Sequence, residues 1–451
     1  MLEKLFKLKA NGTNVRTEVM AGVTTFMTMA YILAVNPSVL SAAGMDSTAV
    51  LIATCLASFI GTLCMALLAN LPFALSAGMG LNAYFAYTVC IGYGYSWKVA
   101  LHAVFIEGLI FIVLSLTNVR EAIFNAIPMA LKKAVSVGIG MFIAFIGLQK
   151  AGLAVNNDAT LVSLVSFREN FHTSGICALL AVVGVLITAA LYIRKFPGAI
   201  LVGILGTWVL GMLCQAVGIY VPDGVDHLSL FPTLTPPDLT AIGETFGQCF
   251  MGDHTNVGVF DMIVIIFSFL FVDLFDTLGT LIGVSAKADM LDEDGKLPAI
   301  RPALLADAIA TSIGAVLGTS TVSTFVESAS GVGAGGRTGL TALTTALLFL
   351  VSILLAPIFI AIPIFATAPA LIFVGFLMFT TITDIKFDDL TSAIPAYLCV
   401  LAMPLFYSIS EGISIGVISY VVINVCCGKA KKIDPVMYVL AVLFVLKYIL
   451  L

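Results

Sequence analysis

Several long apolar stretches of this 451-residue chain carry no charged side chain. Some of them exceed about 18 residues, the length that a helix needs to cross a bilayer. Hydrophobic residues make up 60% of the chain and charged residues only 10%, whereas about 25% of the residues of a soluble domain are charged. So few charges cannot cover the surface of a soluble protein. The sequence therefore predicts an all-α polytopic membrane protein.

The same composition argues against other classes of protein. The net charge of −5 makes a nucleic-acid partner unexpected. The nine cysteines form no CxxC pair and most lie in apolar stretches, so they are expected to be small buried residues. The four histidines are scattered, which indicates no metal site and no metal cofactor. The first apolar stretch, 19–37, is too long for a cleavable signal and is interpreted as the first span.

Apolar stretches between polar breaks predict fourteen membrane spans. The first seven are expected near 17–37, 48–69, 72–91, 98–117, 130–151, 174–193 and 197–220. The other seven are expected near 257–283, 301–319, 320–337, 339–362, 364–383, 390–409 and 411–428. A last apolar stretch, 435–450, contains Lys447 and fits either a short span or an interfacial helix.

The distribution of basic residues predicts the orientation, because cytoplasmic loops are enriched in Lys and Arg. With a cytoplasmic N-terminus, 18 of the 21 basic residues fall inside, among them Arg120, Lys296 and Lys447. Lys98, Lys150 and Arg168 fall outside. The loop 221–256 also falls outside and contains acidic residues but no Lys or Arg. This asymmetry favours a multi-pass protein of the cell membrane with its N-terminus in the cytoplasm.

Seven spans on each side of the outer loop predict an inverted repeat, since an odd number of spans reverses the second half. The predicted organisation is a first repeat at 1–220, the outer loop at 221–256 and a second repeat at 257–428. A basic C-terminal segment with a short apolar helix follows at 429–451.

The third span of each half is rich in helix-breaking or β-branched residues. Residues 71–82 contain Pro72, Gly78 and Gly80, and residues 318–327 contain several Thr, Ser and Val. Such residues favour extended backbone. Extended backbone at membrane depth must be buried in protein or line a cavity. The sequence therefore predicts short extended stretches in spans 3 and 10 beside a midplane binding site, with two glycine-kinked helices as the alternative.

Carboxylates inside predicted spans are costly and mark functional sites. Asp273 and Asp276 are three residues apart on one helical face of span 8, and their mutual repulsion suits a group that binds and releases a proton. Glu327 follows the extended stretch of span 10. Asn82 holds the corresponding place in span 3, and its amide could bind a heterocycle or only a neighbouring helix. A purely structural role, with hydroxyl partners, is the alternative for the aspartates.

Two further carboxylates, Glu107 and Asp307, fall inside spans 4 and 9. The sequence assigns them no role in binding, and packing or gating is the expected one.

Five segments resemble the AzgA-like purine permeases of the nucleobase/ascorbate transporter superfamily: 12–32, 77–85, 272–277, 326–328 and 335–339. The resemblance covers essentially the whole chain. It implies a core domain of spans 1–4 and 8–11 and a gate domain of spans 5–7 and 12–14. The substrate is expected between spans 3 and 10, facing span 8. The residues implied at the site are Met79, Asn82, Asp273, Phe325, Val326 and Glu327.

The resemblance also implies a function: import of purine bases by proton symport, with Asp276 and Glu327 in coupling. Ionised carboxylates accept hydrogen bonds from the N1–H of guanine and hypoxanthine, which favours these bases. Adenine, xanthine or uracil remain alternatives within the same fold. An anion carrier would require a basic residue at the site, and none is near. A membrane-embedded aspartyl hydrolase is the alternative of another class. A homodimer is a possible assembly.

Overall fold

The computed structural model describes residues 2–117, 126–222, 229–232, 238–253, 257–287, 290–291 and 297–450. Much of the loop 221–256, with His227 and His254, lies outside the described residues, as do Arg120 and Lys296 from the orientation count.

The first half of the chain contains nine described α-helices and three strands. They are α1 (Leu2–Phe6), α2 (Val15–Met29), α3 (Ile32–Leu40), α4 (Ser47–Cys64), β1 (Leu75–Ala77), α5 (Met79–Ala83), α6 (Trp97–Leu116), α8 (Met129–Lys150), β2 (Ala154–Asn157), β3 (Leu161–Leu164), α9 (Ile176–Ile193) and α10 (Ala199–Ala216). A π-helical segment, η3 (Tyr84–Gly92), continues α5.

The second half contains nine α-helices and one strand in its described part. They are α11 (Val259–Lys287), α12 (Ile300–Leu317), β4 (Val322–Thr324), α13 (Ser328–Gly333), α14 (Gly339–Val351), α15 (Ala356–Ile360), α16 (Ile364–Phe379), α17 (Leu390–Leu405), α18 (Ile409–Cys426) and α19 (Pro435–Leu450).

Polar side chains mark where several of these helices begin. The side chains of Asn14, Asp46 and Ser96 accept hydrogen bonds from the first turns of α2, α4 and α6. These N-caps satisfy backbone N–H groups that have no partner inside the helix. Ten helical segments of the described chain are long and apolar enough to cross a membrane. The chain is therefore an integral membrane protein, and the count of fourteen spans stays a prediction.

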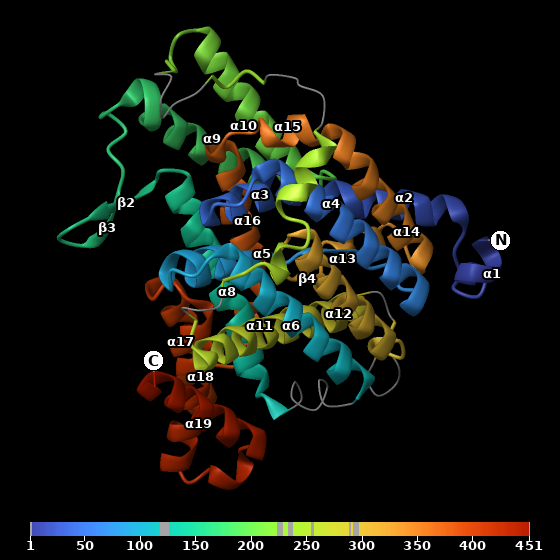
Figure 1. Ribbon diagram of the computed structural model, residues 1–451, viewed down its shortest axis with the longest axis vertical. Helices are drawn as coiled ribbons and strands as arrows, with labels where there is room; N and C mark the ends of the chain where they lie inside the picture. Colours follow the sequence, from blue (N-terminus) through green and yellow to red (C-terminus); the bar gives the residue numbers. More distant parts are fainter. Residues whose placement is uncertain are drawn as a thin grey trace.

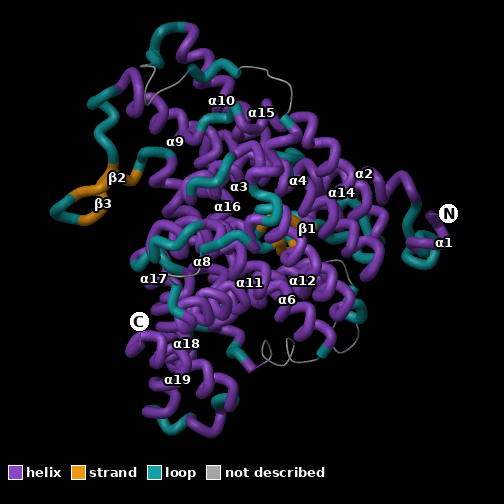
Figure 2. Tube along the Cα trace, in the orientation of Figure 1, coloured by secondary structure: helices purple, strands orange, loops and turns teal. Residues whose placement is uncertain are grey.

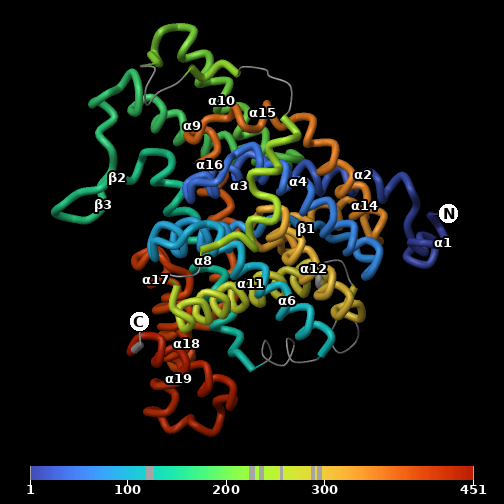
Figure 3. Tube along the Cα trace, viewed as in Figure 1, coloured from blue at the N-terminus to red at the C-terminus, as the bar shows by residue number. Residues whose placement is uncertain are grey.

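The helices pack in two groups, each drawn from both halves of the chain. In one group, α2 and α4 of the first half pack against α14 and α12 of the second. Figure 3 shows these segments side by side, the first pair in blue and the second pair in orange and yellow. In the other group, α8 packs against α16 and α17, toward the opposite side of Figure 1.

Two short pairs of strands interrupt the helical structure. Strands β1 and β4 pair in antiparallel fashion near the centre of the molecule, whereas the β2–β3 hairpin stands at its edge (Figure 2). The central pair consists of the two predicted extended stretches, so the expectation for spans 3 and 10 is confirmed. The hairpin lies in a loop between spans and was not predicted.

The C-terminal helix α19 returns alongside α18. Its 16 residues would extend about 24 Å. Lys447 near its end lies 2.5 Å from the carboxylate of Glu411, in the first turn of α18. Lys429 instead follows the C-terminal end of α18. Lys447 and Lys429 therefore lie at opposite ends of α18, because α19 runs antiparallel to α18, whereas the orientation count placed both on the same side.

Candidate functional site

The two strands at the centre of the molecule form the framework of the site. Leu75 lies opposite Thr324, and Ala77 lies opposite Val322. Two more backbone bonds extend the ladder: Gly78 N–H donates to Thr321 at 2.9 Å, and Phe325 N–H donates to Ala74 at 3.0 Å. Paired strands satisfy backbone groups that could find no water in a membrane. The half-helices α5 and α13 therefore follow opposite ends of this antiparallel pair.

Threonines of the flanking helices hold both strands in equivalent ways. Thr62 of α4 donates to the Leu75 carbonyl at 3.1 Å and accepts from the Leu75 N–H at 2.9 Å. Thr311 of α12 donates to the Val322 carbonyl at 2.9 Å. The second span of each predicted repeat thus supports the third span with the same residue type, as an inverted repeat requires.

Gly78, directly after β1, is required by a close approach. A Cβ atom there would lie 2.8 Å from the Ser323 hydroxyl oxygen of β4. Any side chain would therefore displace the Ser323 hydroxyl, which donates to Asp276.

Two carboxylates meet the framework from α11 and from the end of β4. Ser323 donates to Asp276 at 3.0 Å. Tyr31, which lies between α2 and α3, donates to Glu327 at 2.7 Å. Asp276 and Glu327 are both partly accessible. Each therefore has one side-chain donor in the part of the chain that the structure describes, and can offer acceptor capacity to a ligand.

Asp273 is fully buried. Its carboxylate accepts a hydrogen bond from Thr277, whereas that of Asp276 accepts one from Ser323. The hydroxyl of Thr277 lies 3.0 Å from an oxygen of Asp273 and 3.0 Å from an oxygen of Asp307. Thr324 of β4 also donates to Asp307, at 3.4 Å. The two aspartates of span 8 therefore both have hydroxyl partners, Thr277 for Asp273 and Ser323 for Asp276.

Asn82 of α5 is fully buried. Its amide nitrogen lies 3.5 Å from the carbonyl oxygen of Ala77. Its amide oxygen has no hydrogen-bond partner among the described residues. A buried polar atom without a partner is costly, so this oxygen is available to a ligand donor.

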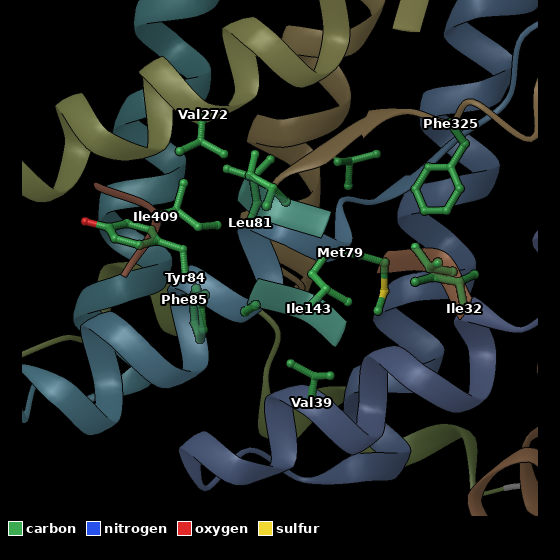
Figure 4. Close-up of a cluster of buried hydrophobic side chains, with 14 of the residues drawn as sticks. Ile32, Val39, Met79, Leu81, Tyr84, Phe85, Ile143, Val272, Phe325 and Ile409 are labelled. Atoms are coloured by element: carbon green, nitrogen blue, oxygen red, sulfur yellow. The ribbon is translucent and has the colours of Figure 1, made fainter. Parts of the chain in front are cut away.

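Apolar side chains surround these polar groups. Met79 and Phe325 are 7% and 6% exposed, and Figure 4 shows them in one buried cluster with Ile32 and Leu81. Val326 is 48% exposed. The arrangement combines apolar surfaces with a few acceptors, which suits a flat heterocycle.

The sequence missed some of the partners in this site. Tyr31 and Ser323 both lie in segments that were singled out, but neither was assigned a role. Glu107, which also had none, accepts a hydrogen bond of 2.9 Å from Thr321, next to β4. The described residues contain no group of three or more His, Cys, Asp or Glu that could hold a metal ion.

Comparisons with known proteins agree with this architecture. A sequence model of the Permease family, Xan_ur_permease, matches residues 16–415. A Methanocaldococcus jannaschii protein named as a permease is 48% identical, over 100% of this chain and 98% of its own. The guanine/hypoxanthine permease PbuG of Bacillus subtilis is 43% identical, over the full length of both chains. The adenine permease AdeP of Escherichia coli is 40% identical, over 100% of this chain and 96% of its own.

A solved structure supports the fold. The transmembrane domain of the cyanobacterial bicarbonate transporter BicA superposes with a TM-score of 0.65 at 17% identity, over 90% of this chain and 97% of that one. This likeness confirms the predicted fold class, a 7+7 inverted repeat.

Proposed function

The chain belongs to the permease family of nucleobase/ascorbate transporters, and we propose that it imports purine bases, with guanine and hypoxanthine as its preferred substrates. A member of this family is a transporter and not an enzyme, so the alternative of a membrane-embedded aspartyl hydrolase is rejected. The relatives named for adenine and for guanine and hypoxanthine support purines as the substrate class.

The observation that carries the proposal is that Asp276 and Glu327 accept hydrogen bonds from Ser323 and Tyr31 beside the β1–β4 pair. The buried amide oxygen of Asn82, which follows β1, has no partner among the described residues. A purine presents N–H donors and a carbonyl or ring-nitrogen acceptor at the edge of a flat ring. Glu327 would accept a ring N–H, the Asn82 oxygen would accept from a second donor, and backbone N–H groups near the strand ends would donate to the carbonyl of the base. Met79 and Phe325 cover the ring, and the backbone at Val326 offers a further contact.

Guanine and hypoxanthine fit acceptors better than adenine does, since both have an N1–H next to a C6 carbonyl. Adenine has an acceptor at N1, and facing an ionised carboxylate it would leave a buried group unpaired, which costs about 1–3 kcal/mol. Uracil and xanthine are weaker candidates. An inorganic anion lacks support, because the hydrogen-bond partners found around Glu327 and Asp276 are hydroxyls and not basic side chains.

A hydroxyl donor shared by two carboxylates supports the proposal of proton symport. The single hydroxyl proton of Thr277 faces oxygens of both Asp273 and Asp307. Two ionised carboxylates around one such proton repel each other, and a proton bound to either relieves the repulsion. Asp276 contacts β4 through Ser323, so its protonation can be linked to the segment between β4 and α13 in which Glu327 lies. A bound proton is the only coupling agent required, without a further cofactor.

The two helix groups provide the moving parts of this proposal. Spans 1–4 and 8–11 form the core domain and carry the site, and spans 5–7 and 12–14 form the gate domain against which the core moves. The N-terminus is assigned to the cytoplasm, and the protein to the cell membrane. A homodimer would anchor the gate domains while the cores move.

Uptake of radiolabelled bases by cells that lack their own purine permeases tests the function. We expect accumulation of hypoxanthine and guanine that a protonophore abolishes. Accumulation that withstands the protonophore but requires sodium would overturn the coupling. Absence of purine uptake by a well-expressed protein would overturn the substrate class.

A further inference from the structure

Tyr31 is a residue of the binding site to which neither the motifs nor the comparisons assign a role. We propose that Tyr31 is a positioning residue that fixes the Glu327 carboxylate and thereby sets the discrimination between guanine and hypoxanthine. The inference rests on the proposed purine transport and concerns selectivity within it.

The contact joins segments 296 positions apart in the sequence. Tyr31 is 1% exposed, and its hydroxyl donates to the Oε1 atom of Glu327 at 2.7 Å. Among the described residues this hydroxyl is the one side-chain donor to Glu327. One carboxylate oxygen is therefore already engaged by the protein, and the other is left as the main acceptor for a ligand.

The backbones on both sides of this contact are held closely together. A Cβ atom at Gly331 of α13 would lie 2.0 Å from the Thr25 hydroxyl oxygen and 2.8 Å from the Ala21 carbonyl oxygen, both in α2. Helix α13 thus packs directly on α2, a few residues from Tyr31 on one side and from Glu327 on the other. Tyr31 and Glu327 consequently belong to one packed unit and keep their contact as that unit moves.

The second oxygen of the Glu327 carboxylate can bind hypoxanthine and guanine in different ways, because the two bases differ in the number of their N–H donors. Hypoxanthine offers one N–H on this edge, whereas guanine offers N1–H together with the 2-amino group. Two parallel donors can bind both oxygens of a carboxylate in a fork. With Oε1 engaged by Tyr31, the fork is hindered, and each base binds to Glu327 mainly through one hydrogen bond. Tyr31 therefore keeps the two affinities similar.

The Tyr31→Phe substitution retains the ring and its packing and removes only the donor. Hypoxanthine then meets a carboxylate that is no longer oriented, whereas guanine orients the carboxylate itself through two donors. We expect the KM for hypoxanthine to rise by up to roughly tenfold, the effect of one hydrogen bond to a charged group. The KM for guanine should rise less, so that the ratio of the two shifts severalfold toward guanine.

The experiment measures uptake of the labelled base that the wild type accumulates, with unlabelled guanine and hypoxanthine as competitors. Tyr438→Phe is the matched control, because the Tyr438 hydroxyl bonds the Ala430 carbonyl at 3.0 Å, in the C-terminal segment. In a Glu327→Gln background, Tyr31→Phe should shift the ratio no further. If Glu327→Gln abolishes uptake, the inference is tested by the ratio of the KM values for guanine and hypoxanthine in Tyr31→Phe compared with that in Tyr438→Phe.

Three results would overturn the inference. An unchanged ratio in Tyr31→Phe, with both bases competing in the wild type, refutes the role of Tyr31 and leaves purine transport intact. An equal shift in the Glu327→Gln background shows that Tyr31 acts through another group. If neither base competes in the wild type, guanine and hypoxanthine are not the substrates, and the proposed function is refuted together with the inference. This outcome can be distinguished from the other two.

Discussion

Ser323 of β4 donates a hydrogen bond of 3.0 Å to Asp276 of α11. The bond links the strand pair to the helix that carries both aspartates of span 8. An asparagine at position 276 can still accept from Ser323, but it cannot take up a proton. We therefore expect Asp276→Asn to exchange bases across the membrane while it no longer accumulates them against a gradient.

Counterflow and proton-driven uptake in proteoliposomes separate these two abilities. Asp389→Asn is a suitable control, because Asp389 is an exposed carboxylate at the start of α17 that pairs with Lys429 at 3.1 Å. The proposed coupling role fails if Asp276→Asn loses counterflow to the same extent as accumulation.

Asp273 tests which carboxylate sets the choice of base. The resemblance implies that Asp273 binds the purine, whereas in the structure it is buried and bonded to Thr277. We expect guanine and hypoxanthine to outcompete adenine by at least about tenfold in the wild type, which corresponds to one mismatched buried hydrogen bond. If Asp273 is a ligand, Asp273→Asn should reduce this preference, because an amide can donate to adenine N1.

Competition against labelled hypoxanthine measures the ranking in both proteins. A variant that keeps the wild-type ranking would assign the selectivity to Glu327 instead. Adenine that displaces hypoxanthine at equal or lower concentration in the wild type would contradict the predicted preference itself.

The ion pair between Lys447 and Glu411 predicts a change in stability. The Lys447 side chain is 6% exposed and that of Glu411 is 22% exposed, and Tyr448 also donates to Glu411. Breaking a buried pair by removing one partner costs about 3–5 kcal/mol, since the other charge stays buried. We expect Lys447→Met to lower the thermal unfolding temperature in detergent. The double variant with Glu411→Met should recover most of the loss, and no recovery would argue against the pairing.

Much of the framework was predictable, because its signals are local. Pro72, Gly78 and the Thr and Val residues around 322 disfavour helix over a few residues, so the extended stretches follow from the sequence alone. Their direct antiparallel pairing was not predicted, because the match between the third spans of the two halves predicted only a binding site beside both stretches. The carboxylates were visible because a charge at membrane depth is rare.

The remaining features depend on contacts that no local pattern records. In the sequence, Tyr31 looks like an ordinary residue of an apolar span. Its contact with Glu327, 296 positions away, exists only in the folded protein. The side on which Lys447 lies depends on the direction of α19 along α18. The β2–β3 hairpin lies in a loop, where register follows from turn geometry and not from burial on one face.

Glu18 is another such residue, and it gives the last prediction. It lies in a segment that resembles the permease family, yet its partners are far away in sequence. The buried carboxylate accepts from the backbone N–H groups of Arg337, Thr338 and Thr341 at 2.9, 3.2 and 3.2 Å. It also accepts from the Thr341 hydroxyl at 2.6 Å. Glu18 thus caps the start of α14 from α2 and lies where the helix dipole favours a negative charge.

Glu18→Ala would leave buried donors at the start of α14 without an acceptor. The N–H groups of Arg337 and Thr338 lose their acceptor, whereas the Thr341 N–H keeps a bond of 3.1 Å to the Thr338 carbonyl. Each unsatisfied donor costs about 1–3 kcal/mol, so the loss should be at least about 2 kcal/mol. Glu18→Gln retains one carbonyl oxygen and should lose less. Glu3→Ala is the control, because Glu3 accepts from the Lys9 backbone in an exposed turn. Thermal unfolding in detergent should rank Glu3→Ala, Glu18→Gln and Glu18→Ala in order of increasing loss. Equal unfolding temperatures for the two alanine variants would show that the cap does not hold α14 to α2.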